Sequence, residues 1–95
     1  MNKSDIVSEV AARTGLNRTD AAGAVDAVFE AVSEALGRRE DVRIAGFGQF
    51  ATRSRPARTG RNPRTGEPVA VEASTAPTFK PARALREAVN AGVTS

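Results

Sequence analysis

A short turn segment, residues 60–66 with the sequence Gly-Arg-Asn-Pro-Arg-Thr-Gly, separates two strand-like runs that are too polar to form a core. The run before it carries Arg53, Arg55 and Arg58, and the run after it carries Glu67, Val69 and Val71. This pattern predicts a two-stranded ribbon that carries positive charge to a tip containing a proline. Because an isolated two-stranded ribbon is marginally stable in water, we expect a partner surface to order it. The charge predicts a polyanionic partner, and a DNA backbone fits best.

Length and composition predict a single small domain spanning residues 1–95, which completes its core by oligomerising. The apolar fraction is 40%, but much of it is alanine, and the only aromatic residues are four phenylalanines. The chain has no cysteine and no histidine. Disulfides and thiolate chemistry are therefore excluded, the usual nitrogen and sulfur ligands of zinc are missing, and we expect no cofactor or metal site.

The first residues of the chain and the length of its apolar runs indicate the cellular location of the protein. No apolar run approaches the roughly 18 residues of a transmembrane helix. The opening residues, Asn2, Lys3, Ser4 and Asp5, lack the apolar stretch of a signal peptide. We therefore expect a soluble, cytoplasmic protein that is not associated with a membrane.

Charge is divided unevenly along the chain. Residues 1–52 hold six basic and eight acidic side chains, whereas residues 53–95 hold eight basic and three acidic ones. This asymmetry predicts an acidic or dimer-forming first half and a polyanion-binding second half. Twelve of the fourteen basic residues are arginine, whose planar guanidinium suits bidentate contact with phosphate.

Two helices are predicted in residues 1–37, the dimerisation part of the chain. Asn2 caps the first helix, with an aspartate three residues later, and Gly15 ends it. Asn17 repeats the capping pattern, and Gly37 stops the second helix after about residue 36. Apolar residues recur at helical spacing in both segments: Ile6, Val7, Val10 and Ala11, then Val25, Val28, Phe29, Val32 and Leu36. The result is a helical hairpin with an apolar stripe available for packing.

Residues 41–80 are predicted to form a three-stranded antiparallel sheet, extended into a long β-arm over about residues 53–75. Gly46 and Gly48 flank Phe47 at a tight turn. Pro56 cannot donate a ladder hydrogen bond, so its strand is expected at an edge. Pro81 suits the first turn of a short helix at residues 81–90, and residues 91–95 are expected to be a frayed tail. The predicted fold class is α+β.

Three segments resemble the HU family of bacterial histone-like DNA-binding proteins. They are Gly46-Phe47-Gly48-Gln49-Phe50, then Ala57 to Glu67 around Gly-Arg-Asn-Pro-Arg-Thr-Gly, then Pro77-Thr78-Phe79-Lys80-Pro81. The opening residues and both helices also fit, so the resemblance covers all but the last few residues. It implies an intertwined dimer, in which two helical hairpins interlock and two β-arms reach around double-stranded DNA in the minor groove.

The resemblance also implies roles for the arm residues. Pro63 matches the family's wedge residue, which enters between base pairs and kinks the duplex; the alternative is that it only shapes the turn. Asn62 and Arg64 lie beside it and are expected near base edges. Phosphate or groove contacts are assigned to Arg53, Arg55, Arg58 and Arg61. The alternative for the arginines is a solvated loop, which five arginines in twelve residues without an interleaved acid argue against.

A second tier of DNA contacts is implied on the flank of the dimer by Lys3, Lys80, Arg83 and Arg86. The alternative is ordinary surface charge on helices. Asp26 faces Lys3 in the family's dimer and is expected to hold it in a competing salt bridge, worth less than about 1 kcal/mol at a surface.

The four phenylalanines, Phe29, Phe47, Phe50 and Phe79, are expected in the core. Binders of single strands use exposed aromatic platforms, which this chain lacks, so duplex DNA is favoured. The scattered acids lack any accompanying histidine, cysteine or glycine-rich phosphate loop, so no catalytic residue and no enzyme activity are expected.

The predicted function is non-sequence-specific bending and compaction of chromosomal DNA, with a preference for bent, nicked or flexible duplex. Two alternatives remain. A site-specific bender of the related IHF type shares the fold, although Ala57-Arg58-Thr59 is more typical of HU. A protein- or glycan-binding module would use the basic arm to grip an acidic partner. The second subunit of the dimer is an identical chain or a paralogue.

Overall fold

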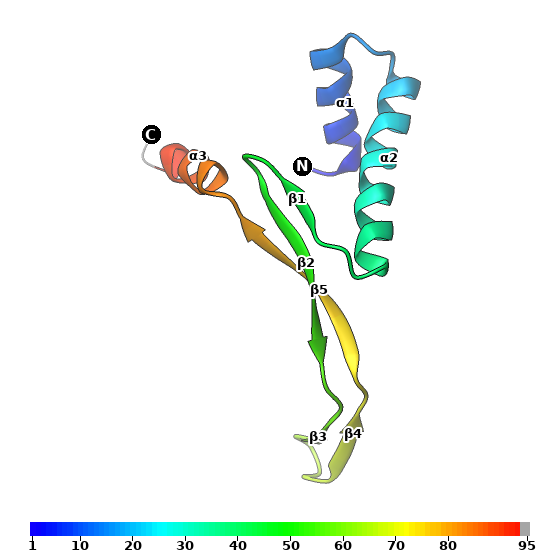
Figure 1. Ribbon diagram of the computed structural model, residues 1–95, viewed down its shortest axis with the longest axis vertical. Coiled ribbons are helices and arrows are strands. Elements are labelled where there is room, and N and C mark those ends of the chain that lie inside the picture. The colour runs from blue at the N-terminus through cyan, green and yellow to red at the C-terminus, as the bar shows by residue number, and fades with distance from the viewer. Residues whose placement is uncertain (94–95) are drawn as a thin grey trace.

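The computed structural model describes residues 1–93 and confirms the α+β fold (Figure 1). A helical hairpin lies beside a three-stranded sheet, from which a long arm extends, and a third helix follows the sheet. In chain order the elements are α1 (Lys3–Thr14), α2 (Arg18–Gly37), β1 (Val42–Ile44), β2 (Gly48–Arg55), β3 (Arg58–Arg61), β4 (Pro68–Val71), β5 (Ser74–Pro81) and α3 (Arg83–Val93).

Both predicted N-caps are confirmed. The Asn2 side chain accepts a hydrogen bond from the Asp5 backbone N–H, and the Asp5 carboxylate accepts one from the Asn2 N–H, which completes a capping box. Asn17 caps α2 in the same way through the Asp20 N–H at 2.8 Å. Gly15 ends α1 with a φ of 76°, a left-handed conformation that glycine adopts without strain.

The core of the single chain is small and lies within the helical hairpin. Val7 of α1 packs against Ala21 and Val25 of α2, and these three are the buried hydrophobic residues of the described chain. Ile6 and Val10 cover them, as the helical spacing predicted. This cluster holds the hairpin together but leaves Val28 and Phe29 of the α2 stripe exposed.

The end of α2 differs from the prediction. Gly37 belongs to the helix, Arg38 caps it with a φ of −89°, and Arg39 takes the left-handed turn with a φ of 64°. The prediction failed because glycine is only the preferred residue for a left-handed turn, and the turn falls two residues later. Arg38 pairs with Glu40 across it, and the hydrogen bond from Arg38 lowers the pKa of the exposed Glu40 carboxyl.

Replacing Arg39 by glycine is expected to stabilise the protein by about 0.5–1 kcal/mol. A left-handed non-glycine residue costs roughly 1–2 kcal/mol, which exceeds the entropy that glycine adds to the unfolded chain. Urea denaturation measures the difference. Arg38→Gly is the comparison: the φ of Arg38 is already favourable, so this substitution should destabilise the protein through the entropic loss and the loss of the ion pair with Glu40. Equal effects of the two substitutions would show that Arg39 is not strained.

Strand alternation gives the three-stranded sheet two different faces. The order is β1-β2-β5, all antiparallel, with Phe50 opposite both Val42 and Phe79. Side chains directly opposite one another share a face, so Thr52 and Pro77 lie on the Phe50 face. These two residues line a cavity of about 330 Å³ together with Ser33, Leu36, Gly37, Arg39 and Thr75. The end of α2 therefore lies against the part of the Phe50 face that carries Thr52 and Pro77, whereas Phe79 on the same face is 42% exposed.

Three of the four phenylalanines form one cluster around Phe50. The ring centroid of Phe50 lies 4.8 Å from that of Phe79 and 6.5 Å from that of Phe47. The predicted turn is confirmed, with the Phe47 N–H donating to the Ile44 carbonyl and Gly46 at a φ of 76°. Gly48 is needed for space, because a β-carbon there would lie 2.6 Å from the Phe79 ring.

The last helix begins later than predicted. Pro81 is the final residue of β5, where it pairs with Gly48, and α3 starts at Arg83. The Ala82 N–H donates to the Phe47 carbonyl, which ties the start of α3 to the turn between β1 and β2. The helix continues to Val93, so residues 91–93 of the predicted tail are helical, and residues 94–95 lie outside the described part.

The single chain is too open to be a complete folding unit. Its accessible surface is 7639 Å², against about 5,200 Å² for a compact monomer of this mass. Its radius of gyration is 19.0 Å, against about 12 Å for a compact domain of this length. Large apolar side chains remain exposed, among them Val28 at 56%, Phe29 at 47% and Phe79 at 42%. The prediction that the phenylalanines are buried therefore fails within one chain.

Candidate nucleic-acid interface

The predicted arm is present as two consecutive two-stranded segments, one beyond the other along its length (Figure 1). The first continues β2 and β5 to the pair Arg55–Ser74, and the second pairs β3 with β4 from Arg58–Val71 to Arg61–Pro68. Pro56 lies in the break between β2 and β3, outside both strands, because it cannot donate a ladder hydrogen bond. The arm therefore reaches far from the body, with a change of sheet along its length.

A network of local hydrogen bonds shapes the arm tip. The Asn62 side chain accepts from the Arg64 N–H at 2.9 Å, and the Asn62 carbonyl accepts from the Gly66 N–H at 2.7 Å. The Asn62 N–H in turn donates to the Glu67 carbonyl, which closes the loop. Asn62 thus has a structural role that the sequence did not reveal, since its Oδ1 atom is used within the turn. Pro63 is exposed in this turn.

The five arm arginines are exposed and available to a partner. Within residues 1–93, no ion pair involves any of them, although Glu67 and Glu72 lie in the same arm. Arg58 is paired with Val71 and Arg61 with Pro68, three positions apart on β3, so the two guanidinium groups belong to opposite faces of the ribbon. Arg53 and Arg55 share one face of β2.

The same alternation gives the arm a small apolar face. Val69 and Val71 share a face with Arg58 and Gly60, and 46% of Val69 and 37% of Val71 are exposed. A β-carbon at Gly60 would touch the Val71 side chain at 3.4 Å. The arm is therefore less polar than its sequence indicated, and these valines help to hold its two strands together.

Lys3 pairs with Asp26 in the structure. The Lys3 Nζ atom lies 2.9 Å from Asp26 Oδ1, and both side chains are largely exposed. The sequence predicted this pair from the family's dimer, and the structure places it within one chain, between the start of α1 and the middle of α2. It links the two helices of the hairpin.

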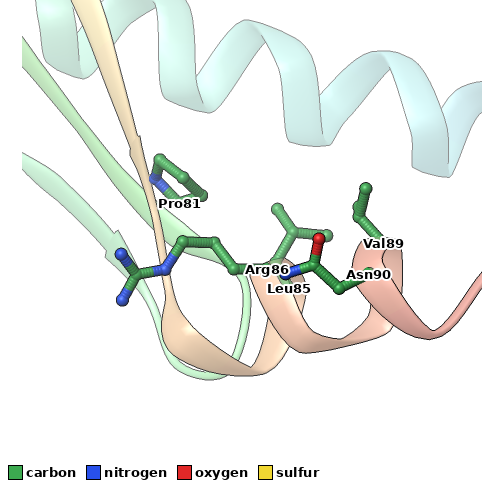
Figure 2. Close-up of a pocket in the computed structure, with 5 residues that line it drawn as sticks. All are labelled: Pro81, Leu85, Arg86, Val89 and Asn90. Carbon is green, nitrogen blue, oxygen red and sulfur yellow. The ribbon is translucent and has the colours of Figure 1, made fainter. Parts of the chain in front are cut away.

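The other predicted flank residues lie on β5 and α3. Lys80 is exposed on the sheet face opposite that of Phe50 (the open face), with Gln49 as its register partner. Arg83 donates to Glu87 at 2.8 Å one turn along α3, so a phosphate would have to compete with this carboxylate. Arg86 extends along the surface away from Val89 (Figure 2). Strand β5 connects these residues to the arm, because it runs from the base of the arm at Ser74 to Pro81, just before α3.

One basic residue of the sheet was not assigned by the sequence analysis. Arg43 of β1 lies opposite Gln49, and Gln49 lies opposite Lys80, so all three share the open face. The alternation of Val42, Arg43 and Ile44 was the available signal, because it places the arginine opposite the two apolar neighbours. This alternation shows on which face of the sheet Arg43 lies, but it does not show which residues or ligands contact that face.

Two classes of site are absent from the described residues. No group of three or more histidine, cysteine, aspartate or glutamate side chains within residues 1–93 is arranged to hold a metal ion. None of the described helices is long and apolar enough to cross a membrane.

The sequence of this chain matches known bacterial DNA-binding proteins over almost its full length. The family model described as bacterial DNA-binding protein matches residues 1–90. DNA-binding protein HU of Geobacillus stearothermophilus is 49% identical over 89 residues, which cover 94% of this chain and 99% of that protein. The HU protein of Streptococcus mutans is 51% identical over 88 residues, covering 93% and 97%.

Solved structures agree with the sequence matches. A cocrystal structure of Anabaena HU with DNA superposes with a TM-score of 0.86 at 36% identity, covering 94% of this chain and 97% of that one. HU from Thermotoga maritima superposes with a TM-score of 0.65 at 30% identity, covering 94% and 98%. The chain therefore belongs to the bacterial DNA-binding protein family and is a member of its HU group.

Proposed function

We propose that this chain forms a dimer that binds double-stranded DNA without sequence specificity, bends it, and compacts the chromosome as a histone-like protein. The exposed arm carries the proposal, because it presents five unpaired arginines on a ribbon that extends far beyond the body of the chain. The HU group supports it, since it is a group of DNA-binding proteins and not of enzymes.

The open apolar surfaces support a dimer of identical chains, with a paralogue as the alternative second subunit. A groove of about 420 Å³ runs along α3, lined by Pro81, Leu85, Arg86, Val89 and Asn90 (Figure 2). Val89 is 60% exposed there, and Phe29 of α2 is 47% exposed. Neither surface is covered within the single chain, and a second copy of the chain would bury both. In this arrangement residues 1–37 provide the dimerisation part and residues 81–90 complete it.

The arrangement of arm charges suits the minor groove of DNA. That groove is only about 6 Å wide, which admits a thin ribbon and excludes a helix. Its two walls are sugar–phosphate strands, and the ribbon carries Arg58 on one face and Arg61 on the other. A ribbon lying in the groove therefore presents a cation to each wall, while Arg53 and Arg55 meet phosphates nearer the body.

Pro63 has the position and chemistry of a wedge. It is exposed at the tip, it is rigid, and it lacks a donor that would need a partner between stacked bases. Unstacking one base step costs a few kcal/mol, which the added phosphate contacts of bent DNA offset. Asn62 and Arg64 hold the tip in shape beside it and are proposed to lie at the groove floor.

The flank residues extend the proposed path of the DNA. Lys80 lies on the open face of the sheet, Lys3 begins α1, and Arg83 and Arg86 lie in the first part of α3. Lys3 and Arg83 are each held by a carboxylate, Asp26 and Glu87, at exposed sites where such pairs are weak. Bound phosphates are proposed to replace these carboxylates as partners. A protein of this kind works in the nucleoid.

The test compares binding to one duplex, intact and with a central nick, at several salt concentrations. A nick removes part of the cost of kinking, so the nicked duplex should bind more tightly. If a dimer neutralises six to eight phosphates, log K should fall with log salt at a slope of roughly −5 to −7 on both duplexes. A slope near zero would exclude a phosphate-binding function, and equal binding would indicate a protein that coats DNA without bending it.

Pro63→Ala distinguishes the contribution of the proline wedge to DNA bending from the contribution of the arginines to phosphate binding. The substitution should reduce the bend of the DNA, measured by energy transfer between dyes at the duplex ends. It should also reduce the ratio of the affinity for the nicked duplex to that for the intact duplex. The salt slope should stay unchanged, because no cation is removed. A bend unaffected by Pro63→Ala would leave the proline a turn-shaping residue. Strong preference for one DNA sequence among many would favour the IHF-like alternative.

A further inference from the structure

The arm has one face on which most of its arginines lie, and this face continues across the break between the two segments. Arg55 pairs with Ser74 before the break, and Arg58 pairs with Val71 after it. Two residues separate these pairs on each strand, so the register is unchanged and the strands cross the break without a bulge. Because side chains alternate along a strand, residues an even number of positions apart share a face. The arginine face therefore carries Arg53, Arg55 and Arg61.

Glu72 is the one acidic residue on the arginine face of the described arm. The unchanged register places it opposite Ala57, within the break, and makes Arg55 its diagonal neighbour. Diagonal neighbours in an antiparallel pair lie roughly 7–8 Å apart, which long side chains can span. The other acid of the arm, Glu67, belongs to the opposite face, since it precedes Val69 by two positions.

The negative charge of Glu72 is available to a ligand of the arm. Its side chain is exposed and forms no ion pair in the described chain. Between Arg55 and Arg61, the first strand contributes only Ala57 and Thr59 to this face, and both are small. The carboxylate therefore stands between two cations. A phosphate that binds Arg55 would lie within the screening length of about 8 Å from this carboxylate and would be repelled by it.

We infer that Glu72 lowers the affinity of the arm for duplex DNA and shortens the lifetime of the complex, because its carboxylate repels the phosphate that binds Arg55. The inference rests on the proposed function and deepens it, since it names a residue of the arm that acts against binding. The two ends of the arginine face then hold the DNA more firmly than the middle does. Such a residue lets a protein with a strongly basic arm exchange between DNA sites.

Glu72→Gln tests this inference, because it removes the charge and keeps the size of the side chain. The substitution should tighten binding to an intact duplex by about threefold to tenfold, since each arm of a dimer loses one weak repulsive contact at an exposed site. The slope of log K against log salt should become steeper by up to about two. Fluorescence anisotropy at several salt concentrations measures both quantities. Dissociation of a labelled duplex into an excess of unlabelled duplex should slow by a similar factor.

The same substitution in an Arg55→Gln background tests the partner of Glu72. Without Arg55, no phosphate is held beside the carboxylate, so the gain from Glu72→Gln should fall to less than half of its value on a logarithmic scale. An undiminished gain would overturn the assignment of Arg55 as the contact that Glu72 weakens. Glu72→Ala should tighten binding as Glu72→Gln does. Tightening by glutamine alone would trace the effect to the new amide and would overturn the inference.

Glu30→Gln is the matched control, because Glu30 is an exposed carboxylate of α2 that forms no ion pair in the described chain. It makes the same change of charge away from the arm and should leave DNA affinity nearly unchanged. The inference fails if Glu72→Gln binds like the unchanged protein or like Glu30→Gln. Equal melting temperatures would show that the variants are folded alike. Absence of salt-dependent binding by the unchanged protein would instead overturn the proposed function.

Discussion

Replacing Arg55, Arg58 and Arg61 together by glutamine is expected to weaken duplex binding about a hundredfold or more at physiological salt. The three side chains are exposed and unpaired, so the change removes up to six phosphate contacts from a dimer without disturbing the core. Counterion release predicts that the slope of log K against log salt becomes flatter by about three to five. Titrations of a labelled duplex between low and physiological salt measure both quantities.

The matched control for the arm replaces the same three residues by lysine. Counterion release depends on charge, so the lysine variant should keep a steep salt slope, with only a modest loss from the missing bidentate geometry. Limited digestion gives a second readout, because trypsin should cut the exposed arm first and duplex DNA should protect it. Equal loss of affinity in the glutamine and lysine variants would mean that the arginines act through specific geometry. An unchanged slope in the glutamine variant would exclude the arm as the main contact.

Replacing Phe29 by aspartate is expected to abolish the dimer and most of the folded structure. Phe29 is 47% exposed in the single chain, which has only three buried hydrophobic residues in its described part. A dimer would bury this ring, and an unpaired carboxylate at the same place would cost several kcal/mol, comparable to the total stability of a small domain. Sedimentation measures the association state, and circular dichroism measures the remaining structure.

The neighbouring residue supplies the control for the dimer prediction. Glu30 is an exposed polar residue on the same helix, and Glu30→Gln should leave both association and melting temperature close to those of the unchanged protein. The melting temperature of the unchanged protein should also rise with protein concentration, because association and folding are linked. A folded monomeric Phe29→Asp variant with normal melting would show that the apolar surface of α2 is not an interface.

Local features of the fold were predictable from sequence because their causes lie within a few residues. The side chains of Asn2 and Asn17 cap the helices by accepting from backbone N–H groups three residues later. The tight turn at Phe47 depends on the two glycines that flank it. The arm followed from a turn motif between two alternating runs. Element ends were less secure, since both the left-handed turn at Arg39 and the late start of α3 at Arg83 depend on how neighbouring elements meet.

The sequence by itself determined the chemistry of this protein: a basic arm with a proline tip, two capped helices, and too few large apolar residues to fill a core. Only the tertiary structure decided which side chains share a surface. Arg43 meets Gln49 and Lys80 because the pairing register of three strands sets them opposite one another, although they are up to 37 positions apart in the chain. Register depends on the packing of Phe50 and Phe79 beneath the sheet, which is a long-range contact that no local pattern contains.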